Sequence, residues 1–592
     1  MNKYTKQQNA KKRTLSSVLP IVSAFILFWF AINIFLFHSV IDYEKAGGAE
    51  KNLNLSRKKG KGKPVAVPIL RNQEENPLNV HLHLPAYPID HRKDIHDAAK
   101  NKAVENIRKM TQSQLQQQTA GESSSRLALS KEAVEMCHQT LWHTLESATI
   151  VLPNNETFVT TGDIKDLFLR DSAAQIHPLI IPNIYNGKSL VQTDPNLERI
   201  VSGLIQRTAR YIRHDPYANS FKIDDSLGAT YNTFERTQLG RNGYISTWNY
   251  ELDSACYYMR MIYFFYASFP SHPVLRLREV QEAIEMMIDL WTSEQRHEED
   301  QYPAGSLFDC ENCGKPYRYN PAELKRNGKG TETNPNTGMT WSGFRPSDDP
   351  CEYGYLVPSN MFAVVALQYV EELAMDKAVW DNPDLAKKAK KLKDDIQDGI
   401  EKHGIVDHEE YGQIYAYEVD GLGNSLLMDD ANIPNLMSLP YLGYDYDPEI
   451  YENTKKFILS QNNPTFHRGT NNFTGDIEGY GSPHTERWIQ HAIWPMSIAM
   501  QALVSDDANE KISFVETLVK ATAGTGWMHE SFDANHPEKF TRPWFCWPDS
   551  LFAELVMSLT YECPQASVYK YKVKEWQDVE HPMKGSVFFV AD

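Results

Sequence analysis

The chain has 592 residues, of which 41% are hydrophobic and 11% aromatic, and its formal net charge at pH 7 is −17. This acidic balance argues against a nucleic-acid-binding protein, because phosphate backbones are bound by basic surfaces. The length leaves room for several average domains or for one large domain with accessory segments. All seven cysteines lie beyond residue 136, and their odd number leaves at least one thiol unpaired.

The first 38 residues predict a membrane anchor. Five basic residues between Lys3 and Arg13 precede an apolar run that extends to Phe37. A run of this length spans a hydrocarbon core of about 30 Å, and the basic flank keeps the N-terminus in the cytosol. We therefore predict a cytosolic tail at residues 1–14, a signal anchor at residues 15–38, and a single-pass type II protein of the endoplasmic reticulum or Golgi membrane with a lumenal body. A cleaved signal peptide is the alternative, but no small-x-small site follows the run.

Residues 39–126 have the composition of a flexible lumenal stem. They contain a basic run, a proline-punctuated stretch and a polar end of low complexity. Such a segment cannot bury enough apolar area to offset the conformational entropy of the chain. Three Asn-x-Ser/Thr sequons, at Asn54, Asn155 and Asn472, are predicted glycosylation sites that agree with a lumenal location.

Helical periodicity dominates residues 127–592, which we predict to form one mainly α-helical domain. Apolar residues recur at helical spacing in the segments 280–291, 361–373, 385–400, 488–503 and 512–522. Long segments rich in Gly, Pro, Asn, Asp and aromatic residues separate them, and long loops in a domain are usually functional. We predict a toroid of α-hairpins whose loops converge at one end. A superhelical repeat protein is the alternative, but the sequence shows no fixed period.

Two acid-rich segments precede predicted helices and are candidate sugar-binding sites. The first contains Asp163, Arg170 and Asp171, and the second contains Glu251 and Asp253. A guanidinium can fork two hydroxyls, and carboxylates can accept hydrogen bonds from vicinal sugar hydroxyls. Each segment also has a structural interpretation, because the first can form a buried ion pair and the second is favoured by a helix dipole alone.

The stretches 340–349 and 524–532 carry the clearest catalytic signal. The first places Arg345, Asp348 and Asp349 beside two aromatic residues, and the second contains Glu530. Sugar hydrolysis needs two carboxyl groups that flank one glycosidic bond. Crowding of like charges raises one pKa of the aspartate doublet, as a general acid requires, and Glu530 is a candidate base. A turn or a helix cap is the alternative for the doublet.

Histidine and tryptophan side chains accompany these carboxylates. His484 can hydrogen-bond sugar hydroxyls or tune a neighbouring acid, although a lone histidine is more often structural. Trp527 and His529 precede Glu530 in a segment rich in aromatic residues. We predict that this segment forms a wall of the sugar site.

Metal and nucleotide motifs are weak. Cys310 and Cys313 have a zinc-knuckle spacing without a second ligand pair, and disulfides are favoured in an oxidising lumen. Asp429 and Asp430 match the acidic metal motif of glycosyltransferases, but no Rossmann-like βαβ pattern accompanies them. A P-loop, a dinucleotide fingerprint and a His-Glu-x-x-His helix are missing from the sequence. We therefore predict no metal and no cofactor.

Six blocks in this order resemble glycoside hydrolase family 125, the exo-α-1,6-mannosidases, and in particular their fungal membrane-anchored branch. The blocks are the segments 161–172, 250–254, 341–349, 427–434, 481–485 and 529–532. The resemblance covers residues from about 128 to 565 and implies an (α/α)6 barrel, hydrolysis with inversion, and α-1,6-mannose-terminated glycans as substrates. Phe168 stands where many members have a tryptophan, which affects only the details of stacking.

The resemblance also implies roles for individual residues. The general acid falls on the Asp348–Asp349 doublet, without a choice between the two, and the general base falls on Glu530. In an inverting enzyme these carboxyl groups lie roughly 6.5–9.5 Å apart, which leaves room for a water molecule. The predicted substrate-binding residues are Asp163, Arg170, Asp171, Glu251, Asp253, Arg345, Asp429, Asp430, His484, Trp527 and His529. We expect a monomer that binds no nucleic acid.

Two other functions fit an anchored lumenal body. A glycosyltransferase would need a nucleotide sugar and usually a divalent ion, so activity that survives a chelator argues against it. A glycan-binding factor would have the same pocket without turnover, so release of mannose from an α-1,6-linked disaccharide excludes it. We favour the hydrolase.

Overall fold

The computed structural model describes residues 128–182, 184–223, 244–309, 314–315, 323–470, 477–560, 562–563 and 573–575. The predicted tail, anchor and stem, which end at residue 126, lie outside these ranges, as do the sequons at Asn54 and Asn472. Within the described ranges, no helix has the combination of length and apolar character needed to cross a membrane. The anchor and the stem therefore stay predictions.

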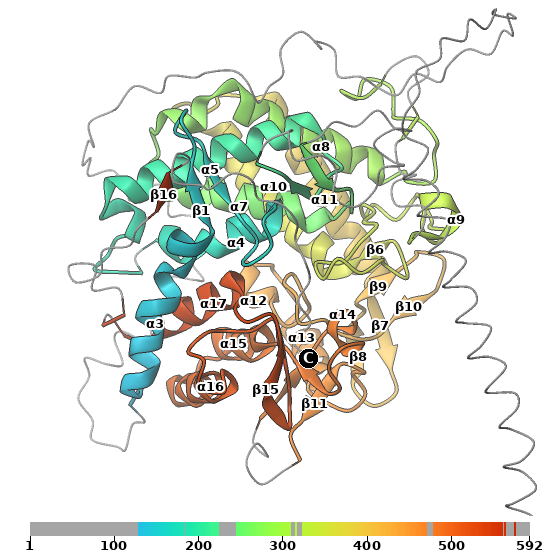
Figure 1. The fold of residues 1–592 in the computed structure, drawn as a ribbon. Coiled ribbons are helices and arrows are strands. Elements are labelled where there is room, and N and C mark those ends of the chain that lie inside the picture. The colour runs from blue at the N-terminus through green and yellow to red at the C-terminus, as the bar shows by residue number, and fades with distance from the viewer. Residues whose placement is uncertain are drawn as a thin grey trace, which may run out of the picture. The chain divides into compact units, whose positions relative to one another are not determined.

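Six inner helices of the described ranges, each labelled in Figure 1, contact one another in a closed cycle. In the order of contact, the ring runs from α4 through α7, α10, α12, α15 and α17 and returns to α4. Every side chain of α4, α7 and α17 is buried, as expected for helices that other elements surround. The bounds are α4 Leu169–Ile180, α7 Leu252–Ser268, α10 Val357–Met375, α12 Leu439–Leu442, α15 Pro495–Val504 and α17 Cys546–Met557.

A second set of helices alternates with the inner set along the chain and exposes one face. These are α3 Lys131–His143, α5 Pro195–His214, α8 Arg278–Glu294, α11 Pro383–His403, α13 Pro448–Ile458 and α16 Ala508–Ala521. Helix α5 packs on α8, and α11 packs on α10, while α16 contacts α15 and α17. Most of them begin at a side chain that accepts a backbone N–H, which stabilises the first turn. These N-caps are Ser130, Asp194, Asn382, Asp447 and Asp507.

Short strands order the loops that lead into the inner helices. They form the sheets β3–β4–β5, β10–β9–β6 and β13–β14–β15, which lie before α4 and α7, before α10, and before α15 and α17. The bounds are β3 Leu167–Phe168, β4 Ser220–Phe221, β5 Ile245–Thr247, β6 Tyr355–Leu356, β9 Glu418–Val419, β10 Ser425–Leu426, β13 Ala492–Ile493, β14 Ser531–Asp533 and β15 His536–Thr541. Since these loops all enter N-terminal ends of inner helices, they bring their polar residues to one end of the ring.

The remaining strands form three smaller sheets, of which the β11–β12 pair contacts β13. Strands β1 Thr149–Val151, β2 Thr157–Val159 and β16 Lys574–Glu575 form one small sheet, and the pairs β7 Ile405–His408 with β8 Gly412–Tyr415 and β11 Phe466–Arg468 with β12 Glu478–Tyr480 form two more. Two single-turn helices, α9 Lys325–Gly328 and α14 Pro483–Glu486, interrupt loops.

The prediction of a mainly helical body is confirmed. The predicted segments 280–291 and 385–400 lie within α8 and α11, and α11 ends at Gly404 as its C-cap. The segment 488–503 is helical only in its second half, because residues 492–493 pair with β14 and the helix starts at Pro495. Proline favours the first turn of a helix, where no N–H partner is required.

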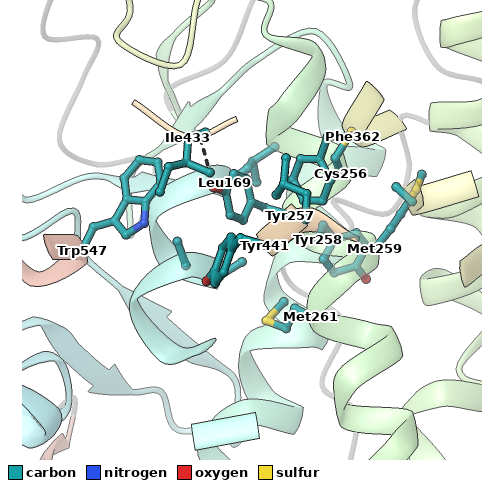
Figure 2. Close-up of a cluster of buried hydrophobic side chains, with 14 of the residues drawn as sticks. Leu169, Cys256, Tyr257, Tyr258, Met259, Met261, Phe362, Ile433, Tyr441 and Trp547 are labelled. Carbon is teal, nitrogen blue, oxygen red and sulfur yellow. Dashed lines mark hydrogen bonds between the residues drawn. The ribbon is translucent and has the colours of Figure 1, made fainter. Parts of the chain in front are cut away.

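The interior of the helical ring is filled by aromatic side chains from different helices. Figure 2 shows Tyr257 of α7 between Phe362 of α10 and Trp547 of α17. The ring centroids are 5.1 Å and 5.7 Å apart, and both pairs are edge-on. The Tyr257 hydroxyl donates a hydrogen bond to the carbonyl oxygen of Ile433 at 3.0 Å (Figure 2). These contacts lie beneath the polar loops and fix three inner helices relative to one another.

A disulfide joins the two ends of the described body. Cys137 of α3 is bonded to Cys563, which follows α17, across 426 positions of sequence. Helix α3 also packs against α17. The described cysteines that stay free are Cys256, Cys351 and Cys546, all buried, whereas Cys310 and Cys313 lie outside the described residues.

Candidate active site

Arg170, in the first turn of α4, is surrounded by carboxylates from the starts of α4 and α7 and from the loop before β6. Its Nη1 lies 2.7 Å from Oε2 of Glu251 and 3.5 Å from Oδ2 of Asp253. Its Nη2 lies 3.7 Å from Oδ1 of Asp348, and its Nε lies 3.4 Å from Oδ2 of Asp171. The structure therefore brings together five residues that the sequence placed in three separate motifs.

Burial perturbs the acids of this cluster. It raises the pKa of Asp171 to about 6, although Arg170 opposes the rise. It also raises the pKa of Asp253 to about 6, again against Arg170. The pKa of Glu251 is raised well above its usual value by burial, and the Asp348 side chain adds to the rise through its charge and a hydrogen bond. A carboxyl held neutral near pH 7 can donate a hydrogen bond to a neighbouring carboxylate.

Asn219 connects two of these acids and was missed by the sequence analysis. Its Nδ2 donates to Oε1 of Glu251 at 3.0 Å and to Oδ1 of Asp348 at 3.4 Å. Its Oδ1 accepts from the hydroxyl of Thr247 at 2.6 Å. Asn219 lies just before β4, outside every motif, so no signal in the sequence marks it.

The aspartate doublet lies on a tight turn. The Asp348 N–H donates to the carbonyl oxygen of Arg345, and the Arg345 N–H donates to that of Asp349. Asp348 adopts a φ of 69°, in the left-handed region that non-glycine residues rarely occupy. Arg345 itself points to Glu418, with Nε 2.5 Å from Oε1. The structure therefore gives Arg345 a fully buried partner that the sequence analysis did not name.

Three carboxylates act on one imidazole. The Nδ1 of His484 lies 3.0 Å from Oδ1 of Asp349. Burial alone would lower the pKa of His484, but the hydrogen bond and charge of Asp349 raise it, together with the charges of Glu530 and Asp348. Asp349 thus contacts His484 directly, and the charges of Asp348 and Glu530 act on the same imidazole.

Exposure separates these three carboxylates from the others. The side chains of Asp348, Asp349 and Glu530 are 34%, 23% and 13% exposed, whereas those of Glu251 and Asp253 are fully buried. A group that transfers a proton to substrate or water must be reachable by it. Asp348, Asp349 and Glu530 meet this requirement, as does Asp163 with 34% exposure, and the catalytic roles stay predictions.

Glu530 faces a cation, Arg542, to which the sequence analysis assigned no role. The Nη1 of Arg542 lies 3.6 Å from Oε1 of Glu530. Its Nε donates to Oδ1 of Asp163 at 2.7 Å. Asp163, a predicted sugar ligand, is thus an ion-pair partner of Arg542.

Four other predicted ligands have partners within the protein. Asp429 accepts the N–H groups of Leu436 and Met437, and Asp430 accepts from Asn432 and Ser482; both aspartates are completely buried. His529 stacks on Phe540 with ring centroids 3.6 Å apart and binds the Arg542 carbonyl oxygen. Trp527 stacks on His143. These contacts hold the loops, and a direct role of the four residues in sugar binding stays a prediction.

Comparison with known proteins decides the class of this site. A family model described as metal-independent α-mannosidase matches residues 130–557. The chain belongs to glycoside hydrolase family 125. It is therefore a glycosidase of the α-mannosidase type, and the family match favours the hydrolase over the glycosyltransferase and the glycan-binding factor. Among the described residues, no group of three or more His, Cys, Asp or Glu side chains is arranged to hold a metal ion.

Two relatives in this family cover most of the chain. The meiotically up-regulated gene 157 protein of Schizosaccharomyces pombe is 36% identical over 439 residues, which cover 72% of this chain and 79% of that protein. A solved α-mannosidase from Streptococcus pneumoniae, in a non-productive complex with α-1,6-mannobiose, is 34% identical. The match covers 78% of this chain and 99% of that one, with a TM-score of 0.64.

Proposed function

We propose that this family 125 member is an inverting exo-α-1,6-mannosidase. The observation that carries the proposal is the family match over residues 130–557, together with the accessible carboxylates of Asp348, Asp349 and Glu530, of which Asp349 contacts His484. An inverting glycosidase uses two carboxyl groups, an acid and a base, on opposite sides of the scissile glycosidic bond. The α-1,6 linkage is supported by the disaccharide in the complex of the Streptococcus pneumoniae relative.

In the proposed reaction, one member of the aspartate doublet protonates the departing glycosidic oxygen. Glu530 takes a proton from a water molecule, whose oxygen attacks the anomeric carbon from the opposite face. The bond between the anomeric carbon and the leaving oxygen breaks, and the products are β-mannose and the shortened glycan. Arg170, Asp171 and His484 hold hydroxyls of the terminal mannose, since they lie around the same carboxylates.

The proposal is tested by digestion of a panel of defined mannobioses while the anomeric signals of free mannose are followed by NMR. We expect rapid cleavage of the α-1,6 isomer and initial appearance of the β-anomer. Glu530→Gln should abolish turnover and retain binding. Cleavage that starts with the α-anomer, or appreciable turnover by Glu530→Gln, would refute the inverting mechanism with Glu530 as the base.

We also propose that the helical body is an (α/α)6 barrel with the site at the N-terminal ends of its inner helices. The closed ring of contacts and the strict alternation of the two helix sets support this arrangement. We expect the protein to be a monomer, which light scattering in a mild detergent would test.

The location in the secretory pathway is a further part of the proposal. We propose that residues 15–38 anchor the protein in the endoplasmic reticulum or Golgi membrane with the body in the lumen. The Cys137–Cys563 disulfide supports an oxidising compartment, and the sequon residue Asn155 is exposed. Protease protection in sealed microsomes tests the topology: a body digested without detergent would contradict it.

A further inference from the structure

Arg542 is the point at which two distant motifs of the chain meet. One of its partners, Asp163, lies 379 positions away in the segment that leads into α4. The other, Glu530, precedes β14, whose partner strand β15 ends at Thr541. A single guanidinium thus joins the segment around Asp163 to the loop that carries the proposed base.

The surroundings of Arg542 fix its side chain on several sides. Its Nη2 donates to the carbonyl oxygen of Thr161 at 2.8 Å. Its guanidinium carbon lies 4.0 Å from the centroid of the Phe545 ring. At Gly162, an added Cβ would lie only 2.7 Å from Nη2, so any larger residue at this position would push the guanidinium aside.

The backbone of Arg542 is also constrained. Its φ is 54°, in the left-handed region, which is unfavourable for a residue with a long side chain. Strained conformations of this kind persist where surrounding contacts over-determine them, and they cluster at functional sites. The contacts on the guanidinium supply that restraint.

The charges around Arg542 are those of acids at the site. Burial alone would lower the pKa of Arg542, but Glu530, Asp163 and Asp171 raise it above its usual value. The side chain is only 14% exposed, so its charge is weakly screened. A cation held in this way favours the ionised form of a carboxylate in front of it.

We propose that Arg542, held in place by Asp163, is a positioning residue that orients the Glu530 carboxylate. This inference rests on the proposed role of Glu530. In this proposal, Asp163 holds Arg542 in place beside the base and does not bind the sugar. Gly162 is required in the same unit, because its missing side chain lets Arg542 approach.

The test compares Asp163→Asn, Arg542→Lys and Arg542→Gln with the unchanged protein on α-1,6-mannobiose. We expect kcat to fall by about tenfold or more in Arg542→Gln. A general base contributes about 10²–10⁴-fold, and a poorly oriented base should lose part of that contribution. Arg542→Lys should recover part of that loss, because it restores the charge. KM should stay within about twofold in all three, since no sugar contact is removed.

The pH dependence provides a readout that a purely structural role would not move. If the charge of Arg542 acts on the proposed base, the acidic limb of the kcat/KM profile should move in Arg542→Gln and stay in place in Arg542→Lys. Arg326→Gln is a matched control, because Arg326 also has a positive φ, of 53°, and pairs with a glutamate, Glu298. It should leave kcat, KM and the profile unchanged.

Each other outcome overturns the inference. A rise in KM with kcat preserved in Asp163→Asn would make Asp163 a sugar ligand. An unchanged kcat and pH profile in Arg542→Gln would remove Arg542 from the mechanism. Equal loss in Arg542→Lys and Arg542→Gln with a lowered melting temperature would give Arg542 a structural role only. If the unchanged protein does not cleave the disaccharide, the proposed function fails first, and that result is distinguishable from the others.

Discussion

At the scale of residues, Arg170 and Arg542 are the two cations around which the acids of the site are arranged. Arg170 lies among the acids at the starts of α4 and α7 and beside Asp348. Arg542 lies between Asp163 and Glu530. Asp171 is influenced by both cations: burial raises its pKa, and the charges of Arg170 and Arg542 each oppose that rise. This alternation of charge lets many carboxylates share a small volume.

The two aspartates of the doublet can be told apart by the leaving group. A general acid contributes about 10²–10⁴-fold only when the departing oxygen needs a proton. We expect that either Asp348→Asn or Asp349→Asn loses most activity on α-1,6-mannobiose and retains it on α-mannosyl fluoride. Steady-state rates of both variants on both substrates identify the acid. If both variants lose both activities equally, neither aspartate acts as the proton donor.

Glu554 of α17 should make stability depend on pH. Burial raises its pKa from 4.5 to about 7, so the folded protein holds a proton that the unfolded chain releases above pH 4.5. Stability therefore falls as pH rises from about 4.5 to about 7, by roughly 3 kcal/mol from this group. Glu554→Gln should melt at the same temperature as the unchanged protein at pH 5 and at a higher temperature at pH 8. Equal melting temperatures at pH 8 would contradict the assignment.

The site residues that could be predicted from the sequence are those that lie inside recognisable motifs. Arg170, Glu251 and Asp348 stand in acid-rich segments, and the structure brings them together. Asn219 could not be found, because its role comes from a contact with Asp348 across 129 positions. Asp429 resembled a ligand, but its oxygens are used by backbone N–H groups of its own loop, and a pattern of residue types does not reveal such use.

At the scale of elements, the long amphipathic helices were predictable and the short strands were not. Helix α11 shows its buried face in the spacing of its apolar residues. Strand β13 has two residues and forms only because β14 lies beside it, 39 or more positions later in the chain. A two-residue strand has no periodicity of its own, so the predicted helix 488–503 ran through it.

The pairing of α3 with α17 gives a prediction for the disulfide. Loss of a native disulfide typically costs about 2–5 kcal/mol, mainly by freeing the unfolded chain. We expect the double variant Cys137→Ala/Cys563→Ala to melt several degrees lower and to keep its kcat, because the bond lies outside the site. Calorimetry with and without reductant measures the effect, and reductant should leave the double variant unchanged. A large loss of kcat would show that α3 supports the site more directly.

At the scale of the whole molecule, the catalytic body should be independent of the N-terminal segment. The family match begins at residue 130 and the described helices begin at α3. We expect a protein that starts at residue 127, with a cleavable signal peptide added in front of it, to be secreted as a folded enzyme with unchanged kcat/KM on α-1,6-mannobiose. A clear decrease in kcat/KM would mean that residues 1–126 contribute to substrate binding.

The bond between Cys137 and Cys563 links the first helix of the body to a position beyond its last inner helix. The second thiol is synthesised 426 positions after the first. Covalent closure must therefore wait until all the inner helices, up to α17, have been synthesised. Premature termination before Cys563 would leave the Cys137 thiol without its partner, and such a free thiol is a feature that quality-control factors could detect.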